Sequence, residues 1–206
     1  MAFEIRASDL PALTLGSSLL ACGGGGNAYY GQLVARDLLA GERAVRVIGL
    51  DEMPAEGLAV CSAIIGAPLI MLEKPPSLTA LGAGLDRVRH FLGPRLSAFV
   101  AAEVGGVQSV LPLLLAAMTG RPLLDGDGMG RAFPEAQMCT FLLYGMNPTV
   151  PLALSDDHGL LWWLPPVRVR PSGGVGAGQA SSDAPQGSSQ SGCCVATARG
   201  RAGFST

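Results

Sequence analysis

Strand-like and helix-like segments alternate along the first 168 residues, and this alternation constrains the fold more than any other feature of the sequence. Short apolar runs rich in Val, Ile, Leu and Ala are separated by longer segments with helical periodicity. Such alternation indicates an α/β domain with a mostly parallel sheet flanked by helices. The expected strands span residues 44–50, 58–65, 96–102 and 122–124, with a further apolar run at 68–72 and strand-like pieces after Pro148.

Capping residues and helix breakers set the bounds of the expected helices. Asn27 stands before a segment that Gly41 closes, and Ser77 stands before one that ends at Gly93 and Pro94. Asn and Ser side chains accept hydrogen bonds from the free N–H groups at a helix start, whereas Gly and Pro end helices. The expected helices span residues 10–15 (capped by Asp9), 28–39, 78–92, 108–118 and 134–144.

The composition changes sharply near residue 169. From Pro171 to Thr206 the chain is rich in Gly, Ser, Ala and Gln, and it contains no Leu or Ile. Such a segment cannot bury enough apolar surface to offset the entropy lost on ordering. The sequence therefore predicts one α/β domain over residues 1–168 and a disordered Gly/Ser-rich tail over 169–206.

Charge and cysteine usage exclude several classes of protein. The net charge is −2 and the basic residues are scattered, so we expect no nucleic-acid partner. The apolar runs are shorter than a membrane span, and we expect no membrane partner either. The five cysteines match neither a zinc site nor a disulfide framework, and we expect a cytoplasmic protein with reduced thiols.

Acidic residues follow three of the expected strands. Glu73 comes after 69–72, Glu103 after 96–102 and Asp125 after 123–124. The carboxyl ends of parallel strands meet at one edge of a sheet, where ligands of α/β proteins bind. We therefore expect these acids to lie along one rim of the molecule.

Two glycine-rich segments stand just before expected helices. Gly23–Gly26 precede Asn27, and Gly105 and Gly106 follow Glu103. Glycine lets the backbone approach a ligand closely, and a helix start offers free N–H groups to an anion. These segments could cradle a carboxylate, a phosphate or a polar heterocycle; the alternative interpretation is a pair of flexible turns.

The densest polar loop runs from Asp125 to Arg131. Asp125 and Asp127 are two residues apart and separated by a glycine, so their carboxylates could hold a divalent metal or position a water molecule. Arg131 could bind a substrate carboxylate or pair with Asp127. A solvated turn is the alternative, because Asp-Gly is common in turns.

Taken together, these motifs resemble the S-methyl thiohydantoin desulfurase domain family over about residues 9–165. The motifs that carry the resemblance are Gly23–Asn27, Gly66-Ala67-Pro68, Glu73-Lys74, Glu103–Gly106 and, most specifically, Asp125–Met138. The sequence departs from the family pattern at Ala28, where Pro is frequent, and at Gln108, where Asn is usual. Family members combine an N-terminal α/β domain with a β-richer C-terminal domain, and this chain resembles only the first.

The resemblance implies hydrolytic release of methanethiol from an S-methyl thiohydantoin, which leaves a hydantoin. Alternatives are a non-catalytic binding or subunit module and an inactive truncated gene product. The partners implied are a small heterocyclic substrate and either a second copy of the chain or a hydantoinase/oxoprolinase-type protein. The expected catalytic residues are Glu103, Asp125 and Asp127, with a divalent metal as a possible cofactor. The expected substrate-binding residues are Gly24, Gly25, Gly26, Asn27, Gly105, Gly106 and Arg131.

Overall fold

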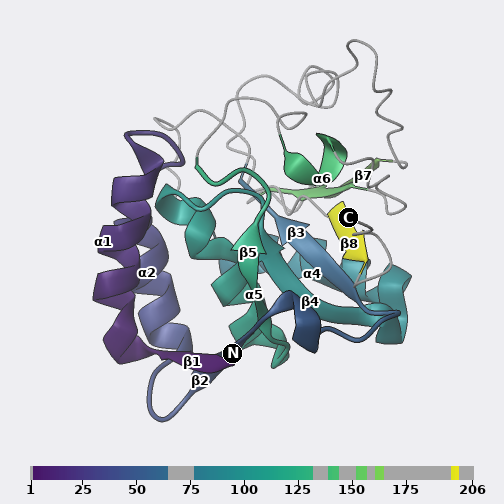
Figure 1. The fold of residues 1–206 in the computed structure, drawn as a ribbon, viewed down its shortest axis with the longest axis horizontal. Helices are drawn as coiled ribbons and strands as arrows, with labels where there is room; N and C mark the ends of the chain where they lie inside the picture. Colours follow the sequence, from purple (N-terminus) through teal and green to yellow (C-terminus); the bar gives the residue numbers. More distant parts are fainter. Residues whose placement is uncertain are drawn as a thin grey trace.

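The computed structural model describes residues 2–64, 77–131, 139–143, 152–156, 161–164 and 196–199. Its centre is a sheet in the order β1-β2-β5-β4-β3-β8 (Figure 1). The strands of this sheet are β1 (Phe3–Arg6), β2 (Ala44–Ile48), β3 (Leu58–Ser62), β4 (Leu96–Ala101), β5 (Leu123–Asp127) and β8 (Ala196–Arg199). A separate antiparallel pair consists of β6 (Leu152–Ser155) and β7 (Leu161–Leu164).

The four inner strands of the sheet run parallel. Strand β5 lies between β2 and β4, with Leu123 opposite Val47 on one side and Phe99 on the other. Strands β4 and β3 also pair parallel, whereas β1 and β8 pair antiparallel at the two edges. The prediction of an α/β domain with a mostly parallel sheet is therefore confirmed.

All the described α-helices except the short α6 cover one face of this sheet. The α-helices are α1 (Leu10–Ala21), α2 (Ala28–Leu38), α4 (Leu78–Leu92), α5 (Leu111–Thr119) and α6 (Thr140–Leu143), and a 3-10 turn, η4 (Gly106–Ser109), precedes α5. Apolar side chains of α4 and α5, such as Leu85 and Leu113, form one core with Val47, Val60 and Phe99 of the sheet. Helix α1 lies beside α2 and also contacts η4 (Figure 1).

The other face of the sheet carries a smaller core. Cys61 and Val100 alternate with the helix-facing residues of their strands and pack with Ile48 and Leu124. Met53, from the connection between β2 and β3, belongs to this core, and Phe141 of α6 packs against it. The chain therefore crosses from β2 to β3 on the face opposite the helices.

The helix caps agree with the sequence analysis in two cases and differ in a third. Asn27 accepts a hydrogen bond from the N–H of Tyr29, and Ser77 accepts one from Ala80. Asp9 precedes α1, but its side chain accepts from the N–H of Arg6 instead of capping the helix.

Helix α1 is longer than predicted, ending at Ala21 instead of at residue 15. The hydroxyls of Ser17 and Ser18 donate to the carbonyl of Thr14, at 3.1 and 2.8 Å. The helix thus satisfies these hydroxyls internally, as serine does in many helix interiors.

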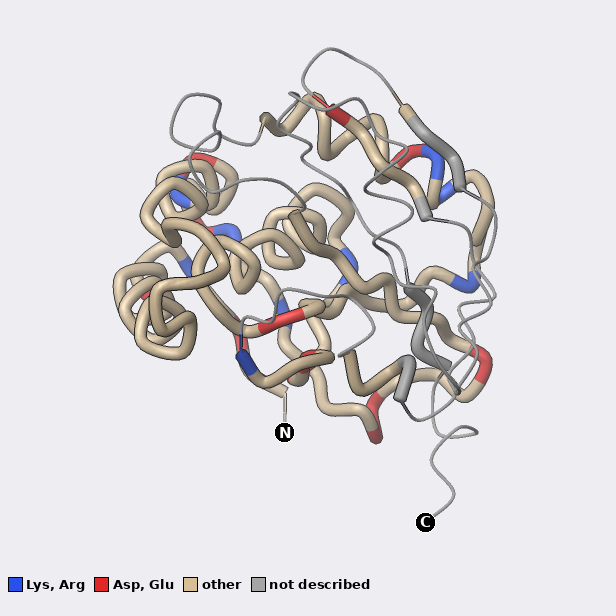
Figure 2. Tube along the Cα trace, turned by 90° about the horizontal axis from the view of Figure 1, so that it is seen from above, with Lys and Arg blue, Asp and Glu red and all other residues tan. Residues whose placement is uncertain are grey.

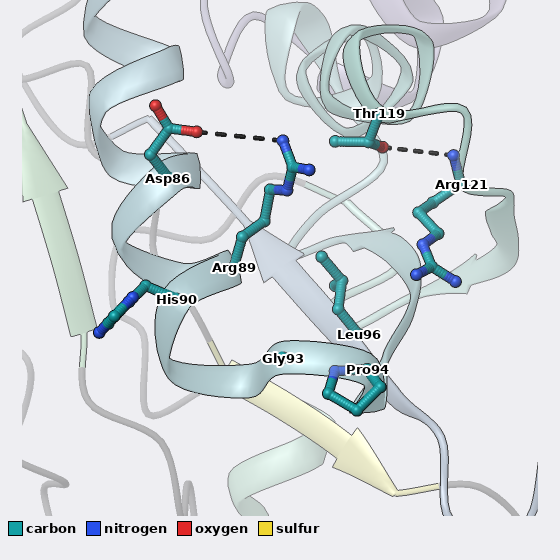
Figure 3. Close-up of a pocket in the computed structure, with 8 residues that line it drawn as sticks. All are labelled: Asp86, Arg89, His90, Gly93, Pro94, Leu96, Thr119 and Arg121. Carbon is teal, nitrogen blue, oxygen red and sulfur yellow. Dashed lines mark hydrogen bonds and ion pairs between the residues drawn. The ribbon is translucent and has the colours of Figure 1, made fainter.

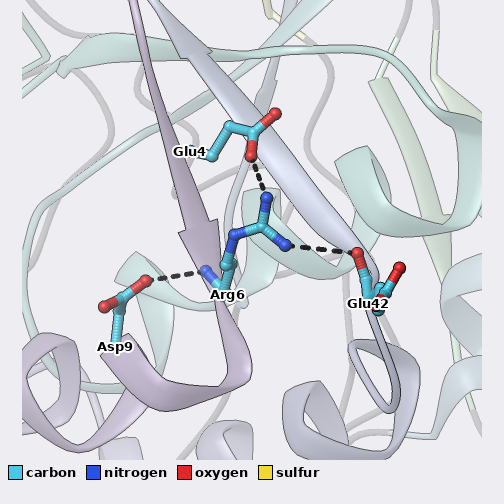
Figure 4. A network of polar contacts seen from close by, with 4 residues as sticks. All are labelled: Glu4, Arg6, Asp9 and Glu42. Carbon is cyan, nitrogen blue, oxygen red and sulfur yellow. Dashed lines mark hydrogen bonds and ion pairs between the residues drawn. The ribbon is translucent and has the colours of Figure 1, made fainter.

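Strand β1 was not predicted, because only Ile5 of its four residues is buried. Polar contacts of Arg6 fix its end (Figure 4). The Arg6 guanidinium donates to the carboxylate of Glu4 at 2.5 Å and to the carbonyl of Glu42 at 3.3 Å. These contacts tie the N-terminal strand to the turn that leads into β2.

Strand β8 lies within the segment predicted to be disordered. It pairs antiparallel with β3 over residues 196–199. Backbone groups at the edge of a sheet offer pairing sites that need no apolar side chain, which is why composition did not reveal this strand. The rest of the predicted tail lies outside the described residues, as do the expected segments 68–72 and 134–138. Among the described helices, none is long and apolar enough to cross a membrane.

Candidate functional site

The acids of the predicted rim come from two adjacent parallel strands. Strand β5 extends further than expected, so that both Asp125 and Asp127 lie within it. Asp127 is opposite Ala101, the last residue of β4, and Glu103 follows two residues later. Glu103 is only 7% exposed, whereas Asp125 is exposed. The structure therefore places Glu103 and Asp125 at one end of the parallel strands, as the strand-end rule predicted, and Asp127 lies there with them.

Asp127 joins two loops through a single carboxylate oxygen. Its Oδ2 accepts hydrogen bonds from the N–H groups of Val104 at 3.0 Å, Met129 at 3.3 Å and Gly130 at 2.6 Å. Val104 directly follows Glu103, and the other two donors belong to the loop after β5. This carboxylate therefore fixes the backbone on both sides of the rim.

Gly128 adds a second set of backbone contacts at the same place. Its N–H donates to the carbonyls of Ala101 and Ala102, and its carbonyl accepts from the N–H of Thr140 at 2.7 Å. A Cβ on Gly128 would overlap the Sγ of Cys139, which is buried. Helix α6 thus begins against the rim, and Cys139 packs there.

The two glycine-rich segments contact each other directly. The N–H of Val107 donates to the carbonyl of Gly25 at 3.0 Å. Gly106 has a φ of +60°, and a Cβ there would overlap the carbonyl oxygens of Gly25 and Gly26. Because the obstacle is backbone, only glycine fits at this position.

Other predicted ligand-binding residues also have structural roles. A Cβ on Gly105 would lie 3.1 Å from the Cα of Ala21 at the end of α1. The Asn27 side chain caps α2 through the N–H of Tyr29 at 3.0 Å. The convergence of the two glycine segments with the Asp125–Arg131 loop agrees with the prediction, and their binding of a ligand stays a prediction. Arg131 is exposed at the end of that loop.

Gln108, which the sequence analysis named only as a departure from the family pattern, has a structural role beside the rim. Its side chain accepts from the N–H of Ile64 at 2.7 Å and donates to the carbonyl of the same residue at 2.8 Å. This pairing imitates a strand partner for the backbone that continues β3. No local pattern indicates it, because the two residues are far apart in the sequence.

Glu73, the third acid that the strand-end rule placed along the rim, lies outside the described residues. Within the part of the chain that the structure describes, no group of three or more His, Cys, Asp or Glu side chains could hold a metal ion. The described residues thus do not assemble a ligand set for the metal that the sequence analysis considered.

A cavity of about 620 Å³ lies at the opposite edge of the sheet, near the start of β4 (Figure 3). Helices α4 and α5 both end there, and helix C-termini attract cations. The guanidinium of Arg89 lies 4.0 Å from the carboxylate of Asp86, and both residues line the cavity together with Arg121. The lining residues are Asp86, Arg89, His90, Gly93, Pro94, Leu96, Thr119 and Arg121.

The charged residues of the described chain are spread over several elements. Figure 2 shows basic and acidic positions interspersed, with no face dominated by Lys and Arg.

Comparison with known proteins identifies the family of the chain. A family model described as S-Me-THD-like, N-terminal domain, matches residues 8–165, which include all three rim segments. The chain belongs to this family. The crystal structure of a protein from Chromobacterium violaceum is similar to this S-Me-THD-like domain, with a TM-score of 0.79 and 28% identity. The similarity covers 95% of this chain and 55% of that protein, so the chain spans about half the length of its structural relative. No curated protein matches.

Proposed function

We propose that this S-Me-THD-like domain binds an S-methyl thiohydantoin at the carboxyl edge of the sheet and hydrolyses its methylthio group. The oxygen of a water molecule adds to the ring carbon that bears sulfur, and the carbon–sulfur bond then breaks. A carboxylate takes the proton from water and returns it to the departing thiolate. The products are a hydantoin and methanethiol.

The observation that carries the proposal is the position of Glu103. Its side chain is 7% exposed and lies at the strand end where the glycine segments meet the Asp125–Arg131 loop. A carboxylate with little access to solvent is suited to act as a general base, since fewer water molecules compete with the reacting one.

The other rim residues supply binding groups in this proposal. Asp125 is exposed on β5, where it can accept a hydrogen bond from a ring N–H. Arg131 is exposed at the end of the loop and can bind a carboxylate on the ring's side chain. Backbone N–H groups of the glycine segments can donate to a ring carbonyl.

A non-catalytic binding module is the alternative. Such a module would bind the same ring without releasing methanethiol.

Thiol release tests the proposal. The full chain is incubated with an S-methyl thiohydantoin, and free methanethiol is followed with a thiol-reactive dye. We expect Glu103→Gln to lower the rate by about 100-fold or more, because a general base contributes 10²- to 10⁴-fold. Asp37→Asn, an exposed change on α2, is the control. Ring binding without any thiol release would favour the binding module, and full activity of Glu103→Gln would contradict the assigned base.

A further inference from the structure

The three acids of the rim, Glu103, Asp125 and Asp127, differ in burial and in hydrogen bonding. Asp127 Oδ2 receives three backbone N–H groups within 3.3 Å. Asp125 is exposed two residues earlier on the same strand, and Glu103 is buried at the end of the neighbouring one. The sequence offers all three as candidate catalytic residues. The three hydrogen bonds to its Oδ2 distinguish Asp127 from the other two.

An oxygen that already accepts three hydrogen bonds is poorly placed to take a proton or bind a metal. A carboxylate oxygen offers about two lone-pair sites, and the three N–H donors occupy them. A reacting water could use Oδ2 only if these donors moved away. Those donors hold two loops, so such a movement would open the rim itself.

We propose that Asp127 is a positioning residue, which fixes the backbone that carries Glu103 against the loop after β5. Through Val104 it holds the residue next to Glu103, and through Met129 and Gly130 it closes the 127–131 loop. The link between Asp127 and the hydrolysis rests on the proposed function. Its role in joining the two loops does not depend on that function.

The contacts of Gly128 support this role. Its N–H donates to Ala101 and Ala102, the two residues before Glu103. Asp127 and Gly128 therefore bind the chain on both sides of Glu103. Because the backbone at Glu103 is held from both directions, a small displacement of Asp127 would move the buried carboxylate.

Two substitutions separate positioning from proton transfer. In Asp127→Asn the amide oxygen can still accept from the three N–H groups, but the amide cannot take a proton. In Asp127→Ala the acceptor is lost. We expect Asp127→Asn to keep methanethiol release within about tenfold of the unaltered chain, and Glu103→Gln to lose about 100-fold or more.

Hydrogen exchange gives a readout that does not require activity. The amides of Val104, Met129 and Gly130 should exchange faster in Asp127→Ala and close to normally in Asp127→Asn, with Asp37→Asn as the matched control. If these amides are unaffected in Asp127→Ala, the loop-joining role is wrong. If Asp127→Asn loses as much activity as Glu103→Gln, Asp127 takes part in the chemistry and the proposal is overturned. If the unaltered chain releases no methanethiol, the proposed function fails while the exchange result still decides the role of Asp127.

Discussion

Replacing Gly106 by alanine tests the contact between the two glycine segments. The new Cβ would overlap the carbonyl oxygens of Gly25 and Gly26 and lie 2.5 Å from the carbonyl carbon of Gly25. All of these atoms are backbone, so the loops must separate to make room. Gly120→Ala is the matched control, since Gly120 has a similar φ of +68° and its Cβ would meet nothing within 4 Å.

The expected cost has two parts. A left-handed backbone costs alanine about 1 kcal/mol, and both variants bear this. Only Gly106→Ala also separates the loops and breaks the bond from Val107 N–H to the Gly25 carbonyl, at 3.0 Å. That hydrogen bond contributes about 1 kcal/mol, and relieving the overlap costs about 1 kcal/mol more. We therefore expect a loss of about 3 kcal/mol for Gly106→Ala and about 1 kcal/mol for Gly120→Ala.

Urea unfolding followed by circular dichroism measures both free energies of unfolding. The difference between the two variants, about 2 kcal/mol, isolates the loop contact from the backbone strain. Equal destabilisation of the two variants would refute the contact between the glycine segments. It would also contradict the placement of Gly23–Gly26 beside Gly105 and Gly106 at the rim, because that placement depends on this contact.

The remaining predictions concern a cap, a buried amide and the core. Ser77→Ala should lower the free energy of unfolding by about 1 kcal/mol, measured by urea unfolding, because the Ala80 N–H loses its acceptor at 3.1 Å. Gln108→Leu should cost about 2 kcal/mol and speed exchange of the Ile64 amide, since both backbone groups of Ile64 lose their partner. Leu115→Ala should cost about 3 kcal/mol in the same assay, because that side chain is fully buried in the helix-side core. A change below 0.5 kcal/mol in any of these would contradict the contact concerned.

Local signals in the sequence predicted most of the sheet and its helices. Helix α2 begins after Asn27, as predicted. Helix α4 begins after Ser77 and ends before Gly93, also as predicted. Apolar runs identified β2, β3 and β4 within a few residues. These signals are reliable because each depends on neighbours in the chain.

Features that depend on distant residues were missed. Strand β1 has one buried side chain, and β8 is held by backbone pairing with β3, so neither has an apolar pattern to reveal it. The strand-end rule predicted that Glu103 and Asp125 lie at the same end of the sheet, and Asp127 was expected nearby as part of the Asp125–Arg131 loop. The positioning role proposed for Asp127 could not be predicted, because the sequence shows an aspartate in either case and does not show whether its carboxylate accepts backbone N–H groups.

The most direct test of the account is to find which backbone amides a bound S-methyl thiohydantoin protects from hydrogen exchange. Amide hydrogen exchange of the full chain is measured with and without a saturating S-methyl thiohydantoin. The account predicts protection at residues 104–107 and 127–131, and no change at Arg89 and Arg121 around the cavity on the opposite edge. Protection confined to that cavity, or absent from the Glu103 rim at saturation, would contradict the assignment of the binding site.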